Sequence, residues 1–238
     1  VMQAASSVRL GEHNVVIAGG MESMSNAPQL LMGQRSGQKM GDSKLIDSMI
    51  HDGLWDVYNN MHMGNTGEII AKECSITRSQ ADEFAAQSHS KAAKAWEEGW
   101  FDWETFPISV PQRRGDNLVL ERDEGVRSDS TADSLSNLRT VFDKDGIVTA
   151  GNASTLNDGA SAVLVTSETY AKQQGWEIIA TIEDYCTAGV EPERVMSAPI
   201  PAVRNLLKRN KLDVLDVDVY EHNEAFASAS CAVAQEIG

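Results

Sequence analysis

Apolar and polar positions follow two different patterns along this chain. Near both ends, continuous apolar runs such as 15–18 are typical of buried strands. The residues before that run predict a helix over 1–10 that stops at Gly11. Further predicted strands are 161–165, 178–185 and the residues around 217–219, and further predicted helices are 168–174, 201–210 and the residues from 226 onward. Strands that alternate with helices indicate an α/β fold, with mixed or parallel sheets covered on both faces.

From about residue 26 to residue 148 strand-like runs almost disappear, and short helical segments are predicted at 44–50 and 66–73. The strongest helix signal starts at Thr77, because Gln80 follows three residues later as in a capping box. Its apolar and small residues recur on one face as far as Gly99. This polar region therefore indicates a large insertion between two strands of the α/β domain.

Composition narrows the classes of function. The 238 residues include 35 acidic and 20 basic side chains, a formal charge of −15, which argues against a nucleic-acid partner. The chain has neither an apolar run of membrane-spanning length nor a signal-peptide pattern. Cys74, Cys186 and Cys231 fit neither a disulfide framework nor a zinc site. We therefore expect no metal, no membrane and a reducing compartment, either the cytoplasm or the mitochondrial matrix.

Three stretches are candidates for chemistry. Asn223 follows a predicted strand and precedes a predicted helix, so its amide is interpreted either as a helix cap or as a ligand contact at a strand end. The motif alone favours the cap. The small residues of 150–160 allow close approach by a ligand or by a neighbouring helix. The arginines at 113, 114, 122 and 127 form either a solvated loop or the cations for a phosphate-bearing ligand.

Taken together, four blocks resemble the thiolase family, in its biosynthetic branch. They are 18–25 (AGGMESMS), 62–64 (HMG), 150–160 (AGNASTLNDGA) and 223–226 (NEAF), and they stand in family order over essentially the whole chain. Residues 44–58 (KLIDSMIHDGLWDVY) also resemble the loop region of that branch. The resemblance implies two similar thiolase halves, each a mixed sheet between helix layers, with an inserted loop domain. Residues 1–24 and 156–177 would belong to the first half, 25–155 to the loop domain that binds CoA and makes oligomer contacts, and 178–238 to the second half.

The resemblance also implies an activity, that of an acetyl-CoA C-acetyltransferase. Two acetyl-CoA would condense to acetoacetyl-CoA and CoA, or the reverse thiolysis would occur, by a ping-pong Claisen mechanism through an acyl-cysteine. Asn223 would be catalytic, holding a water that forms an oxyanion hole together with a histidine. Arg127 would lie against the adenine of CoA. The substrate-binding positions around the pantetheine arm would be Leu54, His62, Met63, Ala150, Gly151 and Ser154, with Ala225 and Phe226 nearby. No cofactor is implied beyond the CoA thioesters themselves.

Some features of the family pattern fall outside the chain. The nucleophilic cysteine would precede Val1, and the glycine-histidine-proline motif and second cysteine would follow Gly238, so we expect an internal part of a longer polypeptide that cannot complete the reaction alone. A homodimer or homotetramer is implied. His222 stands where small or apolar residues are common in the family, and we expect it to pack against its neighbours. The alternatives are a degradative 3-ketoacyl-CoA thiolase and a non-catalytic CoA-binding fragment.

Overall fold

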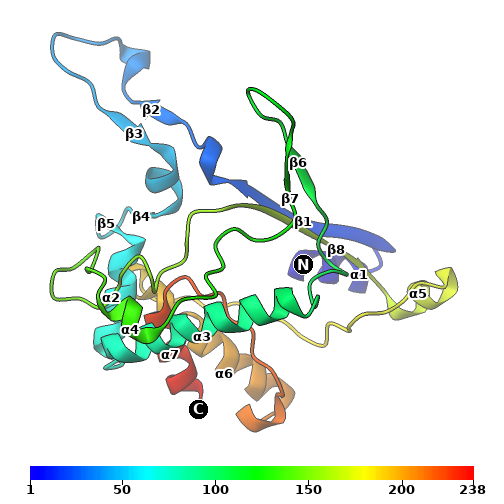
Figure 1. The fold of residues 1–238 in the computed structure, drawn as a ribbon. Coiled ribbons are helices and arrows are strands. Elements are labelled where there is room, and N and C mark those ends of the chain that lie inside the picture. Colours follow the sequence, from blue (N-terminus) through cyan, green and yellow to red (C-terminus); the bar gives the residue numbers. More distant parts are fainter. The chain divides into compact units, whose positions relative to one another are not determined.

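The computed structural model describes residues 1–238, which form two compact units (Figure 1). Unit 1 comprises Val1–His62, Leu156–Pro192 and Ala198–Val219, and unit 2 comprises Met63–Thr155, Glu193–Ser197 and Tyr220–Gly238. Each unit has its own buried apolar cluster. The expected division into two halves and a loop domain, with bounds at 24, 155 and 177, stays a prediction.

Unit 1 is built on the antiparallel pair of β1 (Val15–Ser23) and β8 (Asp158–Thr166), with helix α1 (Met2–Arg9) packed against it. The predicted helix 1–10 is confirmed, and Gly11 takes the left-handed conformation after it. The prediction of a buried run ending in a glycine turn is wrong. β1 continues through Gly19 and Gly20, and Ile17 is 76% exposed. Gly19 lies so close to β8 that a Cβ there would be 2.3 Å from the carbonyl oxygen of Ser161.

The remaining elements of unit 1 are short. They are η1 (Met24–Asn26), β2 (Gln29–Leu31), η2 (Gln34–Ser36), β3 (Leu45–Asp47), the π-helical turn η3 (Met49–Gly53), β4 (Trp55–Asp56), β5 (Met61–His62), α5 (Glu168–Gln174), α6 (Pro199–Asn210) and η5 (Val214–Asp216). The helix predicted at 44–50 is wrong, because residues 45–47 pair with β2 and helical turns begin only at Met49. Helix α5 is confirmed, with Ser167 as its cap and Gly175 left-handed after it.

Two predicted strands, at 178–185 and at 217–219, are absent. An apolar run indicates that a segment tends to be extended or buried. To form a strand, the segment also needs a neighbouring strand whose backbone N–H and C=O groups can hydrogen-bond with its own. Side chains hold the first segment instead. The Nη2 of Arg9 donates to the carbonyl oxygens of Ile182 and Glu183 at 3.2 and 2.7 Å, and its guanidinium lies 5.4 Å from the ring centroid of Tyr185.

Unit 2 is mainly helical. Helix α7 (Ala227–Ile237) packs against α2 (Met63–Glu73) and α3 (Arg78–Glu97), and α4 (Ala132–Ser136) packs against α3. The hairpin of β6 (Ile108–Val110) and β7 (Leu118–Leu120) completes the unit, while η4 (Pro192–Ser197) runs into it from unit 1. The predicted capping box of Thr77 and Gln80 is confirmed. Small residues on α7 let the helices approach closely around Ile70, Val148 and Phe226.

The chain combines helices and strands as expected, but its sheets are smaller than the sequence predicts. All four are two-stranded and antiparallel. Residues 1–238 therefore contain no mixed or parallel sheet, because the predicted strands that would have widened a sheet do not form. No helix is both long and apolar enough to cross a membrane.

Candidate functional site

A cavity of about 430 Å³ lies in unit 2. Its walls come from α3, the turn at 125–130, the loop at 150–155, the segment 221–224 and the start of α7. Five of the predicted site residues line it, namely Arg127, Ala150, Gly151, Ser154 and Asn223. The fold therefore brings together residues almost one hundred positions apart in the sequence.

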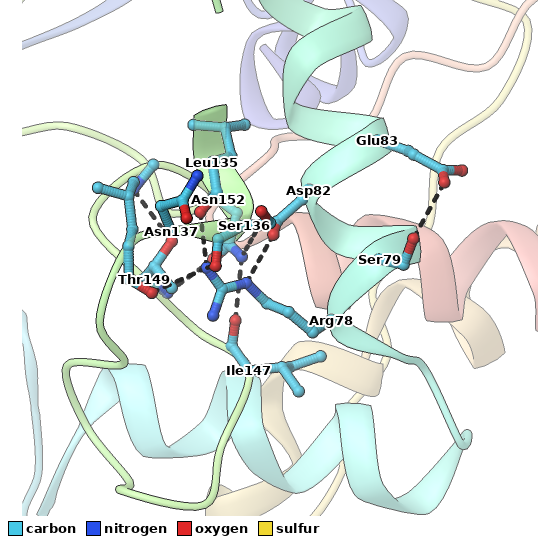
Figure 2. A network of polar contacts seen from close by, with 12 residues as sticks. Arg78, Ser79, Asp82, Glu83, Leu135, Ser136, Asn137, Ile147, Thr149 and Asn152 are labelled. Carbon is cyan, nitrogen blue, oxygen red and sulfur yellow. Dashed lines mark hydrogen bonds and ion pairs between the residues drawn. The ribbon is translucent and has the colours of Figure 1, made fainter. Parts of the chain in front are cut away.

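A buried polar network fixes one wall of this cavity (Figure 2). The carboxylate of Asp82 on α3 is 2% exposed and accepts from Nε of Arg78 at 2.6 Å and from Nδ2 of Asn152 at 2.8 Å. The Nη2 of Arg78 also donates to the carbonyl oxygens of Leu135 and Leu138, at 2.7 and 2.9 Å. Because each buried polar group finds a partner, the network ties the loop after Thr149 to α3 and to the end of α4.

The same loop is held internally and from α2. The Oδ1 of Asn152 accepts the N–H of Thr149 at 2.8 Å, and its Nδ2 donates to the carbonyl oxygen of Ile147 at 3.0 Å. The two carboxylate oxygens of Glu68 accept the N–H groups of Ile147 and Val148, each at 2.8 Å. This segment has no helix or strand of its own, so side chains from α2 and α3 determine its path.

The loop in turn holds the residues that follow Asn223. The N–H of Ser154 donates to the carbonyl oxygen of Ala225, and the N–H of Ala227 donates to that of Asn152, both at 2.9 Å. Phe226 is 8% exposed, belongs to the apolar cluster and packs on Gly67. Neither Ala225 nor Phe226 lines the cavity. Ala225 instead holds the loop at Ser154, and Phe226 packs in the apolar cluster.

Asn223 is not a helix cap, and the interpretation that the motif alone favours is wrong. Helix α7 starts at Ala227 with Phe226 at the N-cap position and no side-chain cap. A tight turn displaces Asn223 from the helix, because its carbonyl oxygen accepts the N–H of Ala225 at 3.0 Å. The side-chain amide makes no hydrogen bond within the chain and is exposed in the cavity. Both its donors and its acceptor are available to a ligand.

Titratable side chains surround this amide. Burial lowers the pKa of His222, against a smaller opposing effect of the Glu224 carboxylate, and Nδ1 of His222 lies 3.1 Å from Oγ of Ser230. Burial, followed by the positive charge of Arg127, lowers the pKa of His89, whereas Glu224 and Asp129 act in the opposite direction. The Nδ1 of His89 accepts the N–H of Arg127 at 3.2 Å. Both rings are therefore biased towards the neutral form.

Two cavity residues, His89 and Glu224, are not among the site residues predicted from the sequence. His89 is four residues after Ala85, on the side of α3 that the predicted stripe marks as buried, so the helical period could have identified it. Glu224 directly follows Asn223, but nothing local indicates that it reaches Ser88 on α3, 136 positions away.

The other predicted site residues lie elsewhere. Leu54 follows the π-helical turn in unit 1 and donates its N–H to Ile50 at 3.0 Å. His62 pairs with Trp55 in the β4–β5 ladder of the same unit, and burial lowers its pKa. Met63 begins α2 in unit 2 and is not a cavity residue. Gly151 lines the cavity, but a Cβ there would meet Leu138 and Leu135 at 2.5 and 2.6 Å, so packing explains the glycine.

The predicted arginine cluster is also divided. Only Arg127 lines the cavity. The guanidinium of Arg122 lies 5.9 Å from the ring centroid of Trp96, while Arg113 and Arg114 are exposed in the connection between β6 and β7. Arg127 is therefore the arginine of this group positioned to meet an anionic ligand in the cavity.

Comparison with known proteins identifies the family. The family described as "Thiolase, N-terminal domain" matches residues 1–169, and "Thiolase, C-terminal domain" matches residues 176–238. The chain belongs to the thiolase family. The resemblance drawn from the four sequence blocks is confirmed, and the thiolase fold is supported by solved structures.

An "Acetyl-CoA acetyltransferase" from Cupriavidus necator is 50% identical to this thiolase over 238 residues, which are 100% of this chain and 61% of that protein. The crystal structure of the Bacillus anthracis acetyl-CoA acetyltransferase matches with a TM-score of 0.94 at 41% identity, over 99% of this chain and 59% of that one. Human mitochondrial 3-ketoacyl-CoA thiolase in complex with CoA matches with a TM-score of 0.92 at 36% identity, over 99% and 58%. The chain thus spans about three fifths of the length of these relatives, which represent both branches.

Proposed function

We propose that this thiolase chain carries part of the site at which an acetyl-CoA C-acetyltransferase condenses two acetyl-CoA to acetoacetyl-CoA and CoA, or runs the reverse thiolysis. The observation that carries this assignment is the unpaired amide of Asn223, which opens into the same cavity as Ser154 and Arg127. The nucleophilic cysteine of this ping-pong mechanism would come from the polypeptide before Val1. In this assignment the substrates are the CoA thioesters.

The chemistry explains why an amide suits this position. A carbanion next to a thioester carries its charge largely on the enolate oxygen, and donors fixed in advance stabilise that charge. The Asn223 amide is neutral at every working pH and can hold a water through either its donors or its acceptor. We propose that this water and a histidine form the oxyanion hole.

We propose substrate-binding roles for the other predicted site residues. Ala150, Gly151 and Ser154 would face the pantetheine arm, and Arg127 would stack on the adenine, as a planar guanidinium can. Local cations matter here because the net charge of −15 repels an anionic ligand elsewhere on the surface. Leu54, His62 and Met63 stay proposed contacts of the pantetheine arm, and Ala225 and Phe226 would lie near it.

Substitution of Asn223 in the intact native polypeptide tests the assignment. Asn223→Ala should lower kcat for thiolysis of acetoacetyl-CoA by about 10²–10³-fold, the usual effect of losing one oxyanion-hole donor. The Kd for CoA, measured by calorimetry, should stay within about threefold of the wild-type value, because the amide contacts the reacting end of the substrate. Asn117→Ala is the matched control, since Asn117 carries an exposed amide in the β6–β7 hairpin away from the cavity. Wild-type turnover by Asn223→Ala would refute the role.

The same assay separates the branches. We favour the biosynthetic type, which the residues of 44–58 and the 50% identity to an acetyl-CoA acetyltransferase support. Turnover of acetoacetyl-CoA should then exceed that of a long-chain 3-ketoacyl-CoA, and the reverse order would assign a degradative enzyme. Labelled acetyl-CoA should acetylate a cysteine of the intact polypeptide other than Cys74, Cys186 and Cys231. Tight CoA binding without any such label would leave a non-catalytic CoA-binding module.

We further propose the layered architecture of two similar halves, and assembly as a homodimer or homotetramer. Apolar side chains on the two paired strands of unit 1 support the assembly, since Ile17 and Met21 on β1 are exposed, as are Val163 and Leu164 on β8. Exposed apolar groups on a sheet with unpaired edges favour burial against another chain or against further strands. Light scattering of the intact polypeptide would give the mass of the assembly.

A further inference from the structure

The segment that carries Asn223 has no regular secondary structure of its own. Residues 217–225 form neither helix nor strand, and the Asn223 side chain is hydrogen-bonded to nothing in the chain. Its direction therefore depends on the backbone on either side. A catalytic amide has to be held close to its productive geometry, so contacts that fix the neighbouring residues decide how well it can work.

Three contacts fix the residues next to Asn223. On one side, His222 meets Ser230 of α7 at 3.1 Å. On the other, the carbonyl oxygen of Ala225 accepts from Ser154. Between them, the Oγ of Ser88 donates to Oε2 of Glu224 at 2.5 Å, which joins the residue directly after Asn223 to α3.

The Ser88 contact is exposed to solvent, but it joins Glu224 to a well-packed helix. Helix α3 is 20 residues long, capped at its start, and packed against both α4 and α7. Hydrogen bonds to a carboxylate are roughly twice as strong as neutral ones. Glu224 lines the same cavity as His89 and His222, and its charge raises the pKa of both rings against the larger effect of burial. Loss of this contact would free the Glu224 carboxylate and remove one of the restraints on the residues next to Asn223.

We propose that Ser88 is a positioning residue for the reaction, whose Oγ–H holds Glu224 and thereby sets the direction of the Asn223 amide in the cavity. Its kinetic consequence rests on the proposed function. Ser88 does not itself contact the reacting atoms. Its contribution is to restrain Glu224, and with it one orientation of a segment that has no regular secondary structure.

Kinetics of the intact polypeptide give the first test. Ser88→Ala should lower kcat by about tenfold while KM and the Kd for CoA stay within about twofold, because the lost constraint acts on the transition state rather than on substrate binding. Ser88→Thr, which keeps the hydroxyl, should restore turnover to within about threefold of wild type. Glu224→Ala should match Ser88→Ala, and the double variant should be no worse than either one, as expected for two halves of one contact.

The same helix offers a matched control. Ser79 donates its Oγ to Oε1 of Glu83 at 3.0 Å, an exposed serine–glutamate contact on α3 that lies outside the cavity (Figure 2). Ser79→Ala should therefore leave kcat unchanged. If Ser79→Ala lowers kcat as much as Ser88→Ala does, the effect comes from the helix as a whole and the positioning role is refuted.

A second readout does not depend on turnover. In protein labelled with ¹⁵N-asparagine, the backbone and side-chain signals of Asn223, assigned by their loss in Asn223→Asp, should shift or broaden in Ser88→Ala and remain in place in Ser79→Ala. Unchanged Asn223 signals in Ser88→Ala would overturn the proposal. If the wild-type polypeptide shows no thiolase activity, the proposed function fails while these signals still decide whether Ser88 positions Asn223.

Discussion

Replacement of Asp82 by alanine is the sharpest test of what holds the cavity wall. The Asp82 carboxylate is 2% exposed and receives hydrogen bonds from Arg78 and Asn152. Removing one partner of a buried ion pair usually costs about 3–5 kcal/mol, because the remaining charge is left unpaired. Here the cost should fall at the lower end. The Arg78 side chain is 25% exposed and keeps its carbonyl acceptors, and Asn152 keeps Ile147.

Alanine also recovers a small amount of helix propensity relative to aspartate, about 0.5 kcal/mol. We therefore expect Asp82→Ala to lower the free energy of unfolding by about 3 kcal/mol, a large fraction of the usual 5–15 kcal/mol. In a chain of this size that loss corresponds to a decrease in Tm of roughly 6–12 °C. Urea denaturation followed by circular dichroism measures the free energy, and calorimetry measures Tm.

Glu83→Ala provides the control for this experiment. Glu83 is the next residue of the same helix, is exposed, and accepts a side-chain hydrogen bond from Ser79. Its removal should change the free energy of unfolding by less than about 0.5 kcal/mol. An Asp82→Ala protein within about 1 kcal/mol of wild type would show that the network does not stabilise unit 2, and the reasoning would be wrong.

Two further predictions concern backbone packing and pH. Gly19→Ala should strongly destabilise the β1–β8 pair, because the new Cβ would lie 2.3 Å from the carbonyl oxygen of Ser161. Gly20→Ala should be tolerated, because no atom lies within 4 Å of a Cβ at that position. Thermal melts of the two variants measure the difference in Tm. Burial lowers the pKa values of His89 and His222 below the ordinary value of 6.5. As pH falls through 6.5, the unfolded chain therefore binds more protons than the folded chain. The free energy of unfolding should decrease until the pH is below the folded pKa values. Tm measured from pH 7.5 to 5 should fall less in His89→Gln and His222→Gln, and equal slopes in wild type and variants would contradict this.

Capping signals in the sequence predict the ends of individual helices. Thr77 and Gln80 mark the start of α3 because a capping box is satisfied within four residues, and Gly175 ends α5 because it can take a left-handed conformation. The strands predicted at 178–185 and 217–219 fail for the opposite reason. Strand formation depends on a partner that is distant in sequence, and no pattern within a run identifies that partner.

The candidate site shows the same limit. Small residues at 150–154 and the amide at 223 could be selected from the sequence, and they line one cavity. The interpretation of Asn223 as a cap failed because the N-cap position of α7 is Phe226, three residues after Asn223. Asp82 is a charged residue near the start of α3, and nothing local in the sequence indicates that it is buried. Its partner Asn152 is 70 positions away, so only the folded chain reveals the pair.

The geometry around Asn152 explains why the cavity wall and the segment that carries Asn223 form one structure. Its Nδ2 faces two acceptors, the Asp82 carboxylate and the carbonyl oxygen of Ile147, while its Oδ1 faces a donor, the N–H of Thr149. Only a side-chain amide satisfies all three contacts, because an aspartate would supply no donor and would place a second carboxylate beside Asp82. The backbone oxygen of the same residue accepts the N–H of Ala227, the first residue of α7. A chain of contacts therefore runs from the buried carboxylate on α3 through Asn152 to the residues that follow Asn223, so a change at Asp82 should weaken the site as well as the fold.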